Sequence, residues 1–359
     1  MKKIMFLIFL FLSLMVCITS LGWAGGLEDA DAGLEAAKGG DYDKALGLFT
    51  KAIESGELSQ KNLSMVYSDR GVIWKSKGDY DKAISDYTKA IEIDPQHAVA
   101  YYNRGITWYE KGQYDKAISD CTKAIEIDPQ LADAYHNRGL AWFSKGDYDK
   151  AISDYTKAVE INPKHADAYY NRGFAWYKKG QYDKAISDYT KVIEINPKYV
   201  KAYYYRGIAW SIKGDYDKAI SDYTKAIELD PQHPYAYYNR GRAWFFKGDY
   251  DKAISDYSKV IEINPKHADA YYKRGFAWYK KGQYDKAISD YTKAVEIDPQ
   301  DVDAWNNRAR IYSLKGEKDK ALSDLKRAIT LDEFFKDYAK EDKHFKDLWD
   351  DEDFKKLTE

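Results

Sequence analysis

Apolar and polar residues along this chain follow one short pattern that returns every 34 residues. In one period, Tyr67, Gly71 and Trp74 are spaced four and three residues apart, which places them on one face of a helix. A second helix is predicted from about Tyr80 to Ile93, where apolar residues again recur at helical intervals. Each period therefore predicts two helices joined by a short turn.

Glycine and proline mark the ends of these helices. Gly78 is expected to end the first helix, because glycine takes a left-handed C-terminal conformation without steric cost. Pro95 prevents the second helix from continuing. Hairpins of this kind bury their apolar faces only against neighbouring copies, so the period predicts an all-α solenoid with a long surface and no closed pocket.

Small residues fall where the two helices of a hairpin should touch. Gly71 and Ala83 leave room there, and Trp74 can fill the space beside them. Burial of an aromatic side chain contributes on the order of 4 to 6 kcal/mol as an upper bound, so we expect the tryptophans to be core residues rather than ligand contacts. Tryptophan recurs at the same place in Trp108, Trp142, Trp176, Trp210, Trp244 and Trp278.

These positions resemble the tetratricopeptide repeat (TPR) family, whose 34-residue unit has the order aromatic, Gly, aromatic, Ala, aromatic, Ala, Pro. The residues that carry the resemblance are Tyr67, Gly71, Trp74, Ala83, Tyr87, Ala90 and Pro95. The resemblance implies a right-handed superhelical solenoid of helix-turn-helix repeats. It covers nine repeats, at about 26–59, 64–97, 98–131, 132–165, 166–199, 200–233, 234–267, 268–301 and 302–335.

Both ends of the repeat array depart from the pattern. Ala36 stands at the tryptophan place of the first repeat, and Ala309 and Glu333 replace the glycine and the proline of the ninth. Such departures are expected of capping units, which meet solvent or a non-repeat segment on one side. Residues 336–359 are charged, with apolar residues at roughly helical intervals, and are predicted to form a C-terminal capping helix.

The first 24 residues differ from the repeats. Two lysines precede an uncharged apolar stretch, and Gly22-Trp23-Ala24 has the form of a signal-peptidase site. We therefore predict a signal peptide at 1–24 and a secreted or periplasmic protein. The alternative is an uncleaved anchor in the inner membrane, formed by residues 4–24, since that stretch carries no charge.

Charge and cysteine content narrow the possible functions. Lys+Arg 56 against Asp+Glu 58 gives a net charge of −2, which argues against nucleic-acid binding. After cleavage Cys121 is the single cysteine, so no intramolecular disulfide is expected. It stands at a place held elsewhere by tyrosine, such as Tyr87, and is predicted to be a buried small apolar residue.

No catalytic or cofactor motif is found in the sequence. A phosphate-binding loop, a nucleophile elbow and a His-Glu-x-x-His motif are all missing. Histidines such as His97, His165 and His267 recur in loops, at least one repeat apart, which is too far for a zinc site. We therefore predict a non-enzymatic protein with no metal and no cofactor.

An arginine precedes the repeat glycine, and an aspartate recurs on the second helix with the same period. A guanidinium near a helix interface needs a partner, so these residues are predicted to form a ladder of structural ion pairs. The arginines are Arg70, Arg104, Arg138, Arg172, Arg206, Arg240, Arg274 and Arg308, and the aspartates are Asp86, Asp120, Asp154, Asp188, Asp222, Asp256, Asp290 and Asp324.

The TPR resemblance implies that the first helices line a concave face, where two sets of residues are candidates for ligand binding. The first set is Asn103, Asn137, Asn171, Asn239 and Asn307. An asparagine amide can pair with both the N–H and the C=O of an extended peptide. The alternative is that these amides cap or brace neighbouring helices.

The second set is aromatic and comprises Tyr102, Tyr170, Tyr204, Tyr238 and Tyr272, with Tyr109, Tyr177, Tyr279, Phe143 and Phe245 seven residues further along. Tyrosine suits contact with peptide or sugar, although neighbouring helices can also bury these rings against each other. Arg242 and Lys273, with Lys201, Lys280 and Arg310, make the later part of the face more basic than the earlier part, where Asp133 and Asp167 lie. An acidic ligand segment should prefer the later half.

The TPR site for C-terminal carboxylates is not supported, because only its middle asparagine is present and tyrosine or aspartate holds the basic places. We predict a protein-interaction scaffold of the cell envelope that binds an extended peptide segment of a partner along the concave groove. The alternative is a module that binds carbohydrate or envelope polymer through the aromatic face. A third possibility is the substrate-positioning arm of a separate enzyme. Membrane contact is expected only through an uncleaved N-terminal segment.

Overall fold

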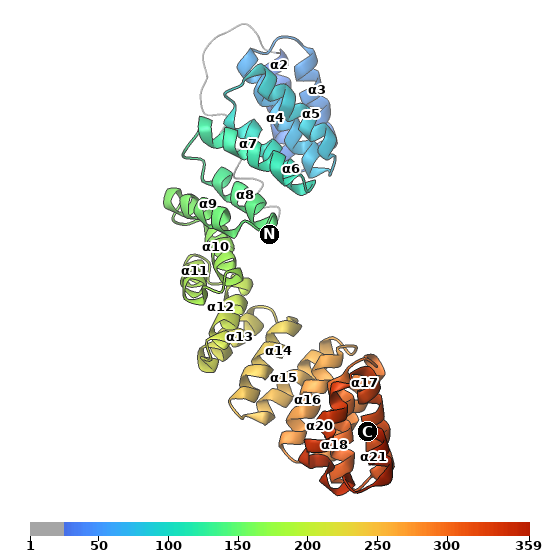
Figure 1. Cartoon of the computed structure of the whole chain (residues 1–359). Helices are drawn as coiled ribbons and strands as arrows, with labels where there is room; N and C mark the ends of the chain where they lie inside the picture. The colour runs from blue at the N-terminus through green and yellow to red at the C-terminus, as the bar shows by residue number, and fades with distance from the viewer. Residues whose placement is uncertain (1–24) are drawn as a thin grey trace. The chain divides into compact units, whose positions relative to one another are not determined.

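The regular structure of this chain is helical throughout the part that is described. The computed structural model describes residues 25–359, and no strand occurs among them (Figure 1). The predicted signal peptide or anchor, residues 1–24, lies outside the described residues. None of the helices in 25–359 combines the length and the apolar character that a membrane span requires.

The helices come in consecutive hairpins, as the period predicts. The first helices of the hairpins are α2 (Gly25–Lys38), α4 (Gln60–Ser76), α6 (Ala98–Glu110), α8 (Ala132–Ser144), α10 (Ala166–Lys178), α12 (Val200–Ile212), α14 (Pro234–Phe246), α16 (Ala268–Lys280) and α18 (Val302–Leu314). The second helices are α3 (Tyr42–Glu54), α5 (Tyr80–Ile93), α7 (Tyr114–Ile127), α9 (Tyr148–Ile161), α11 (Tyr182–Ile195), α13 (Tyr216–Leu229), α15 (Tyr250–Ile263), α17 (Tyr284–Ile297) and α19 (Lys318–Leu331).

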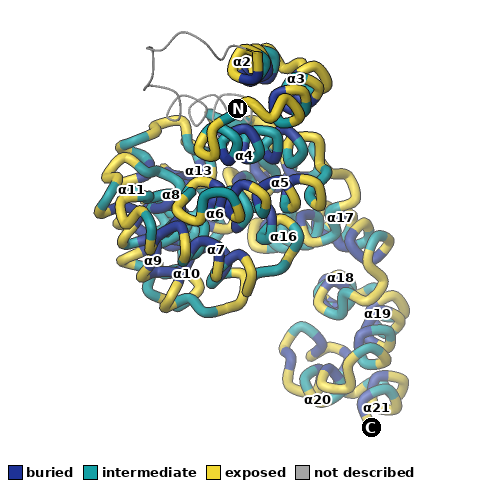
Figure 2. The backbone as a smooth tube through the Cα atoms, turned by 90° about the horizontal axis from the view of Figure 1, so that it is seen from above, coloured by how far each residue is buried: buried dark blue, intermediate teal, exposed yellow. Residues whose placement is uncertain are grey.

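The described chain divides into two compact units. The first unit ends at Lys184 and the second is Ala185–Glu359, so the division falls inside α11. Within each unit, the two helices of a hairpin pack together and successive hairpins pack against each other. Figure 2 shows that the helices carry both buried and exposed residues along their length, which is the pattern of a solenoid of amphipathic hairpins.

The turn inside each hairpin is set by a glycine followed by a capping residue. Gly78 has φ +84°, and its N–H donates to the carbonyl of Lys75 at 2.9 Å while Asp79 N–H donates to that of Trp74 at 2.9 Å. This left-handed ending is readily adopted by glycine. The Asp79 side chain then accepts the N–H of Lys82 at 3.2 Å and so caps α5.

Tyrosine, rather than tryptophan, provides the most deeply buried aromatic side chains. Tyr87 is completely buried, and so is the corresponding Tyr155. Trp74, predicted from the sequence to be core, is only half-buried, and the ammonium group of Lys82 lies 4.3 Å from its ring centroid. Trp74 lies at the edge of the hairpin, where the second helix covers one ring face with a lysine side chain.

The predicted ladder of ion pairs between arginine and aspartate is confirmed in both units. In α8, Arg138 donates from Nε and Nη2 to the two carboxylate oxygens of Asp154 at 2.8 and 2.7 Å. Its Nη1 donates to the hydroxyl of Thr122 on the preceding hairpin at 3.1 Å. Asp154 is 6% exposed, so the pair is a desolvated interaction with two hydrogen bonds inside the hairpin. The same ion pairs join Arg70–Asp86, Arg104–Asp120, Arg206–Asp222, Arg240–Asp256, Arg274–Asp290 and Arg308–Asp324.

The residues after the last hairpin do not form the single capping helix predicted from the sequence. They form α20 (Phe334–Glu341), the 3₁₀ helix η1 (Lys343–Leu348) and α21 (Glu352–Thr358). Asp342 and Asp351 each accept backbone N–H groups from the element that follows, which starts a new helix instead of continuing the old one. Phe345 and Phe354 are buried in a cluster with the last hairpin, so the segment does cover that end of the second unit.

Candidate functional site

The candidate ligand residues all lie on first helices. We call the side of these helices that carries them the first-helix face. In the first unit it includes Tyr102 and Asn103 on α6, Asn137 on α8, and Tyr170, Asn171 and Tyr177 on α10. In the second unit it includes Tyr204 on α12, Tyr238, Asn239 and Arg242 on α14, Tyr272, Lys273 and Tyr279 on α16, and Asn307 on α18.

In the first unit, the side-chain amides of Asn137 and Asn171 contact the preceding first helix. Asn137 donates to the hydroxyl of Tyr102 at 3.3 Å and to the backbone carbonyl of Asp133 at 2.8 Å. Asn171 lies 2.8 Å from Nε2 of His136, one hairpin earlier. The contacts with Tyr102 and His136 each join residues 35 positions apart, so they connect consecutive first helices.

The same link occurs in the second unit. Asn239 donates to the hydroxyl of Tyr204 at 3.1 Å and to the carbonyl of Tyr235 at 3.0 Å, and Asn307 donates to the hydroxyl of Tyr272 at 3.1 Å. Both N–H groups of Asn239 are therefore engaged. Its side-chain oxygen accepts no hydrogen bond from the described residues, so the group that it offers to a ligand is an acceptor.

Lysine replaces asparagine at one place on this face. The ammonium group of Lys273 lies 4.8 Å from the ring centroid of Tyr272, its neighbour on α16. Without an amide to bind, the hydroxyl of Tyr238 donates to the carboxylate of Asp269 instead. Burial and this carboxylate both raise the pKa of Tyr238 above that of free tyrosine. Tyr238 therefore remains a neutral hydrogen-bond donor at physiological pH.

Much of the predicted aromatic set packs within the face. On α10, the rings of Tyr170 and Phe174 are parallel at 6.4 Å, and those of Phe174 and Tyr177 lie 6.1 Å apart. Phe245 stacks on Phe276 of the next first helix at 5.3 Å. Within each unit, such stacked rings give the face an apolar part that presents ring edges and partial faces.

Tyr102 is the most buried residue of the predicted ligand set, because of Cys121. It is 7% exposed, whereas Tyr204 and Tyr272 are only half-buried. In their hairpins a second-helix tyrosine lies beneath the ring, as in the pairs Tyr204–Tyr223 at 6.1 Å and Tyr272–Tyr291 at 5.8 Å. The smaller Cys121 leaves space that Tyr102 fills, which removes Tyr102 from the accessible part of the face.

Two histidines and an aspartate meet between α8 and α10. His165 accepts the N–H of Ala168 at Nδ1, 3.3 Å away, so its Nε2 carries the proton that it donates to Asp133 at 3.1 Å. The His136 and His165 ring centroids are 4.7 Å apart. Burial, with a smaller contribution from His165, lowers the pKa of His136 to about 4. Within residues 25–359, no group of His, Cys, Asp and Glu is arranged to hold a metal ion.

Sequence reasoning missed several exposed apolar residues on the face. Tyr235 and Phe246, at the two ends of α14, are 60% and 59% exposed. Val99 on α6, Ile212 on α12 and Leu314 on α18 also belong to the exposed large apolar residues. They stand at the second or the thirteenth position of a repeat, where most other repeats carry a charged residue or serine. That contrast between repeats was the signal that could have identified them.

The C-terminal segment occupies the end of the face in the second unit. Arg310 on α18, which the sequence suggested as an exposed charge, donates from Nε to Asp342 at 2.5 Å and from Nη2 to the hydroxyl of Tyr338. His344 Nε2 lies 2.7 Å from the hydroxyl of Tyr279. Arg310 and Tyr279 are therefore engaged by residues of the same chain.

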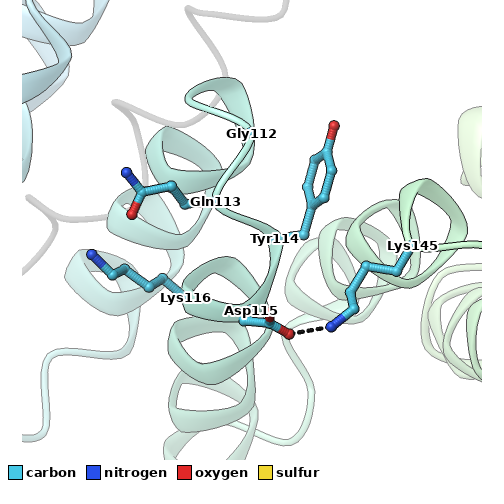
Figure 3. Close-up of a pocket in the computed structure, with 6 residues that line it drawn as sticks. All are labelled: Gly112, Gln113, Tyr114, Asp115, Lys116 and Lys145. Atoms are coloured by element: carbon cyan, nitrogen blue, oxygen red, sulfur yellow. Dashed lines mark hydrogen bonds and ion pairs between the residues drawn. The ribbon is translucent and has the colours of Figure 1, made fainter.

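A shallow hollow of about 360 Å³ lies at a turn of the first unit, lined by Gly112, Gln113, Tyr114, Asp115, Lys116 and Lys145 (Figure 3). An ion pair between Asp115 and Lys145 crosses it from one hairpin to the next. The same pair recurs as Lys111–Asp81 and Lys247–Asp217. The hollow is thus a product of the repeat rather than a dedicated site.

Comparison with protein families gives matches over most of the repeats. A model described as TPR repeat matches residues 71–110, 139–180 and 241–282. Two models described as Tetratricopeptide repeat match 98–131, 166–199, 200–233 and 268–301, and 222–255 and 290–323. A search of curated proteins finds no match.

Solved structures of repeat proteins are similar to this chain. A protein from Cytophaga hutchinsonii, described as the C-terminal part of a TPR repeat-containing protein, is 24% identical, with 65% of this chain and 96% of that chain covered and a TM-score of 0.57. YrrB, described as a TPR protein with an unusual peptide-binding site, is 29% identical, with 51% and 95% covered and a TM-score of 0.47. With the family matches and the helical hairpins, the chain belongs to the tetratricopeptide repeat family.

Proposed function

We propose that this chain is a non-enzymatic scaffold of the cell envelope that binds an extended segment of a partner protein along its first-helix face. TPR repeats generally bind protein or peptide partners. The observation that carries the proposal is the pair of exposed aromatic residues on this face of α14, Tyr235 and Phe246. Exposed apolar residues gathered on one face of a folded protein are typical of interaction sites.

The polar groups of the face suit a peptide backbone. Asn137 and Asn239 keep a side-chain oxygen that accepts no hydrogen bond from the described residues, while their N–H groups hold the tyrosines in place. Such an oxygen can accept a backbone N–H of the ligand. Helices pack about 8 to 10 Å apart and an extended chain advances about 3.3 Å per residue, so acceptors on successive helices would meet about every third residue.

Binding arrays compare this proposal with its main alternative. The full chain is applied to peptide arrays and to glycan arrays under the same conditions. We expect peptide spots to retain the protein and glycan spots not to retain it, since the face offers ring edges and fixed acceptors rather than several fully exposed ring faces. Retention on glycans alone would show that the ligand is a carbohydrate or envelope polymer and not a peptide.

A double variant tests whether the asparagines contribute. Asn171→Ala with Asn239→Ala removes one amide from each unit, and we expect peptide affinity to fall about tenfold, as two hydrogen bonds are lost. The matched control is Asn162→Ala with Asn264→Ala, two exposed asparagines that follow second helices. Equal affinity of wild type and the first variant, with both folded by circular dichroism, would contradict a role for these amides.

The envelope location rests on residues 1–24 and has its own test. If the segment is a signal peptide, the protein recovered from cells begins at Gly25 and is released with the periplasmic or secreted fraction. N-terminal sequencing of that protein measures this directly. A protein that keeps residues 1–24 and sediments with the membranes would support the anchor instead.

A further inference from the structure

The contacts of Arg310 show what an arginine on the first-helix face can bind. Its Nε donates to Oδ2 of Asp342 at 2.5 Å, its Nη1 donates to Oδ1 of Asn307 at 3.0 Å, and its guanidinium carbon lies 5.4 Å from the ring centroid of Tyr338. Asp342 and Tyr338 belong to the C-terminal segment, which is not part of any repeat. This arginine thus binds a carboxylate and an aromatic ring, four residues apart, in one non-repeat segment.

Arg242 holds the same repeat position as Arg310, two repeats earlier in the same unit. Asn239 stands three residues before Arg242, as Asn307 stands before Arg310, and each of these amides donates to a tyrosine hydroxyl of the preceding first helix. At this position the repeats from the second onward otherwise carry the apolar residues Val72, Ile106, Leu140, Phe174, Ile208 and Phe276. The combination of arginine and asparagine is therefore particular to α14 and α18.

The two arginines differ in what they contact. Arg310 is ion-paired, whereas Arg242 is exposed and pairs with no carboxylate in residues 25–359. Tyr235 and Phe246 stand seven residues before and four residues after Arg242 on α14, which places the three side chains along one side of the helix. A solvated cation between two exposed aromatic rings is suited to a segment that brings both negative charge and apolar surface.

The surroundings also define how a ligand reaches Arg242. The C-terminal segment contacts Arg310 from the side of the second unit that lies beyond its last repeat. Beside α14, the next hairpin is already in place, with α16 packed against α15. A ligand must therefore approach Arg242 from the first-helix face. Asp269 on α16, engaged by the hydroxyl of Tyr238, is an acidic group on that side, and Lys273 on the same helix offsets its charge.

We infer that Tyr235, Arg242 and Phe246 on α14 form a docking site for a segment of a partner protein in which an aromatic residue precedes a carboxylate by about one helical turn. The inference rests on the proposed function, because it names the class of segment that the first-helix face accepts. Arg242 binds the carboxylate, and the rings of Tyr235 and Phe246 cover the aromatic residue. The side-chain oxygen of Asn239 accepts an N–H from the segment.

The test uses a labelled synthetic peptide with the sequence of residues 334–348, which contains the aromatic residue and the carboxylate at the required spacing. Its binding to the full chain is measured by fluorescence anisotropy. We expect Arg242→Gln in the protein, or Asp342→Asn in the peptide, to raise Kd at least tenfold, and the two changes together to cause little further loss. Phe246→Ser should weaken binding severalfold.

The control variant is Lys225→Gln, which removes one positive charge from the exposed side of α13 in the same unit and should leave Kd unchanged. Binding that is insensitive to Arg242→Gln would overturn the inference. If peptides from the arrays still bind that variant with full affinity, the proposed function stands while the docking site fails. If neither the probe nor any array peptide binds the full chain, both fail.

A second copy of this chain is the remaining source for such a segment. Light scattering of the full chain over a range of concentrations measures whether the chain forms dimers. A monomer at all concentrations agrees with a partner protein as the source. A dimer that Arg242→Gln abolishes would overturn the assignment to a partner protein.

Discussion

A methyl group added to Gly139 would lie 2.6 Å from Cε1 of Tyr155, closer than such atoms approach in proteins. The glycine on the first helix and the buried tyrosine on the second helix are therefore matched in size. In the ninth repeat the first-helix residue is larger and the second-helix residue is smaller. Ala309 and Leu325 stand at these positions in one buried cluster, and both are completely buried. Both positions change in the ninth repeat, whereas the third repeat keeps Gly105 opposite the smaller Cys121.

Gly139→Ala is predicted to destabilise the first unit by about 1 to 3 kcal/mol, because the methyl group overpacks against the tyrosine ring. Adding Tyr155→Leu reproduces the pair of the ninth repeat and relieves the clash. The double variant should then lose less stability than the sum of the two single changes. Urea denaturation of the four proteins measures the coupling, and additive losses would contradict the size match.

Arg138→Leu is predicted to cost on the order of 3 to 5 kcal/mol, since it leaves the buried carboxylate of Asp154 without its partner. Replacing both residues by leucine should be much less costly, because no unpaired charge remains. The control is Lys145→Leu, which breaks the exposed pair with Asp115 and should cost under about 1 kcal/mol. Hydrogen exchange of α8 and α9 amides locates the effect, and equal losses for Arg138→Leu and Lys145→Leu would contradict it.

Cys121 is predicted to resist alkylation in the folded protein. Burial raises the pKa of the Cys121 thiol to about 12, so only about one thiol in ten thousand is ionised at pH 8. Iodoacetamide labelling followed by mass spectrometry of the peptide that contains Cys121 should show modification about 100-fold slower than in urea. Labelling at the same rate in both conditions would mean that the thiol is accessible.

His136 is predicted to make the first unit less stable in acid. Its pKa is lowered to about 4 in the folded chain, mainly by burial, and is about 6.5 when unfolded. Between these values the unfolded chain binds more protons, so this contribution to stability is present above pH 6.5 and is lost as the pH falls toward 4. His165, Asp133, Asp167 and Asn171 face the ring and remain in place in His136→Gln.

Thermal unfolding of wild type and His136→Gln at pH 7 and pH 4.5 measures this effect. The variant should lose less stability on acidification than the wild type. Equal losses in the two proteins would exclude His136 as a source of the pH dependence.

The repeating part of the fold could be predicted from the sequence because the same local rules act in every copy. The glycine at Gly78 predicted the end of the first helix, and the apolar pattern predicted the second helix at Tyr80–Ile93. The pairing of Arg70 with Asp86 followed from the period that the two residues share. Depth of burial was less predictable. Trp74 and Tyr87 both look like core residues in the pattern, and only their packing shows that the tyrosine is enclosed while the tryptophan is covered by a lysine.

The site was predicted in outline but not in its contacts. The sequence placed Asn137 and Tyr102 on one face, yet their hydrogen bond joins two repeats at a separation of 35 residues, and a pattern aligned within one repeat does not show it. The C-terminal segment has no period at all. Its contacts with Arg310 and Tyr279 depend on where a non-repeating chain folds, which no neighbouring copy indicates.

The placement of ion pairs within and between hairpins affects how easily each unit bends. The desolvated Arg138–Asp154 pair lies within a hairpin, and a hydrogen bond from Arg138 to the hydroxyl of Thr122 reaches the preceding one. Ion pairs that cross between hairpins, such as Lys145–Asp115, are more exposed. Neighbouring hairpins can therefore tilt apart without leaving a buried charge unpaired. Within each unit, this arrangement favours reversible bending between hairpins over unfolding of a hairpin.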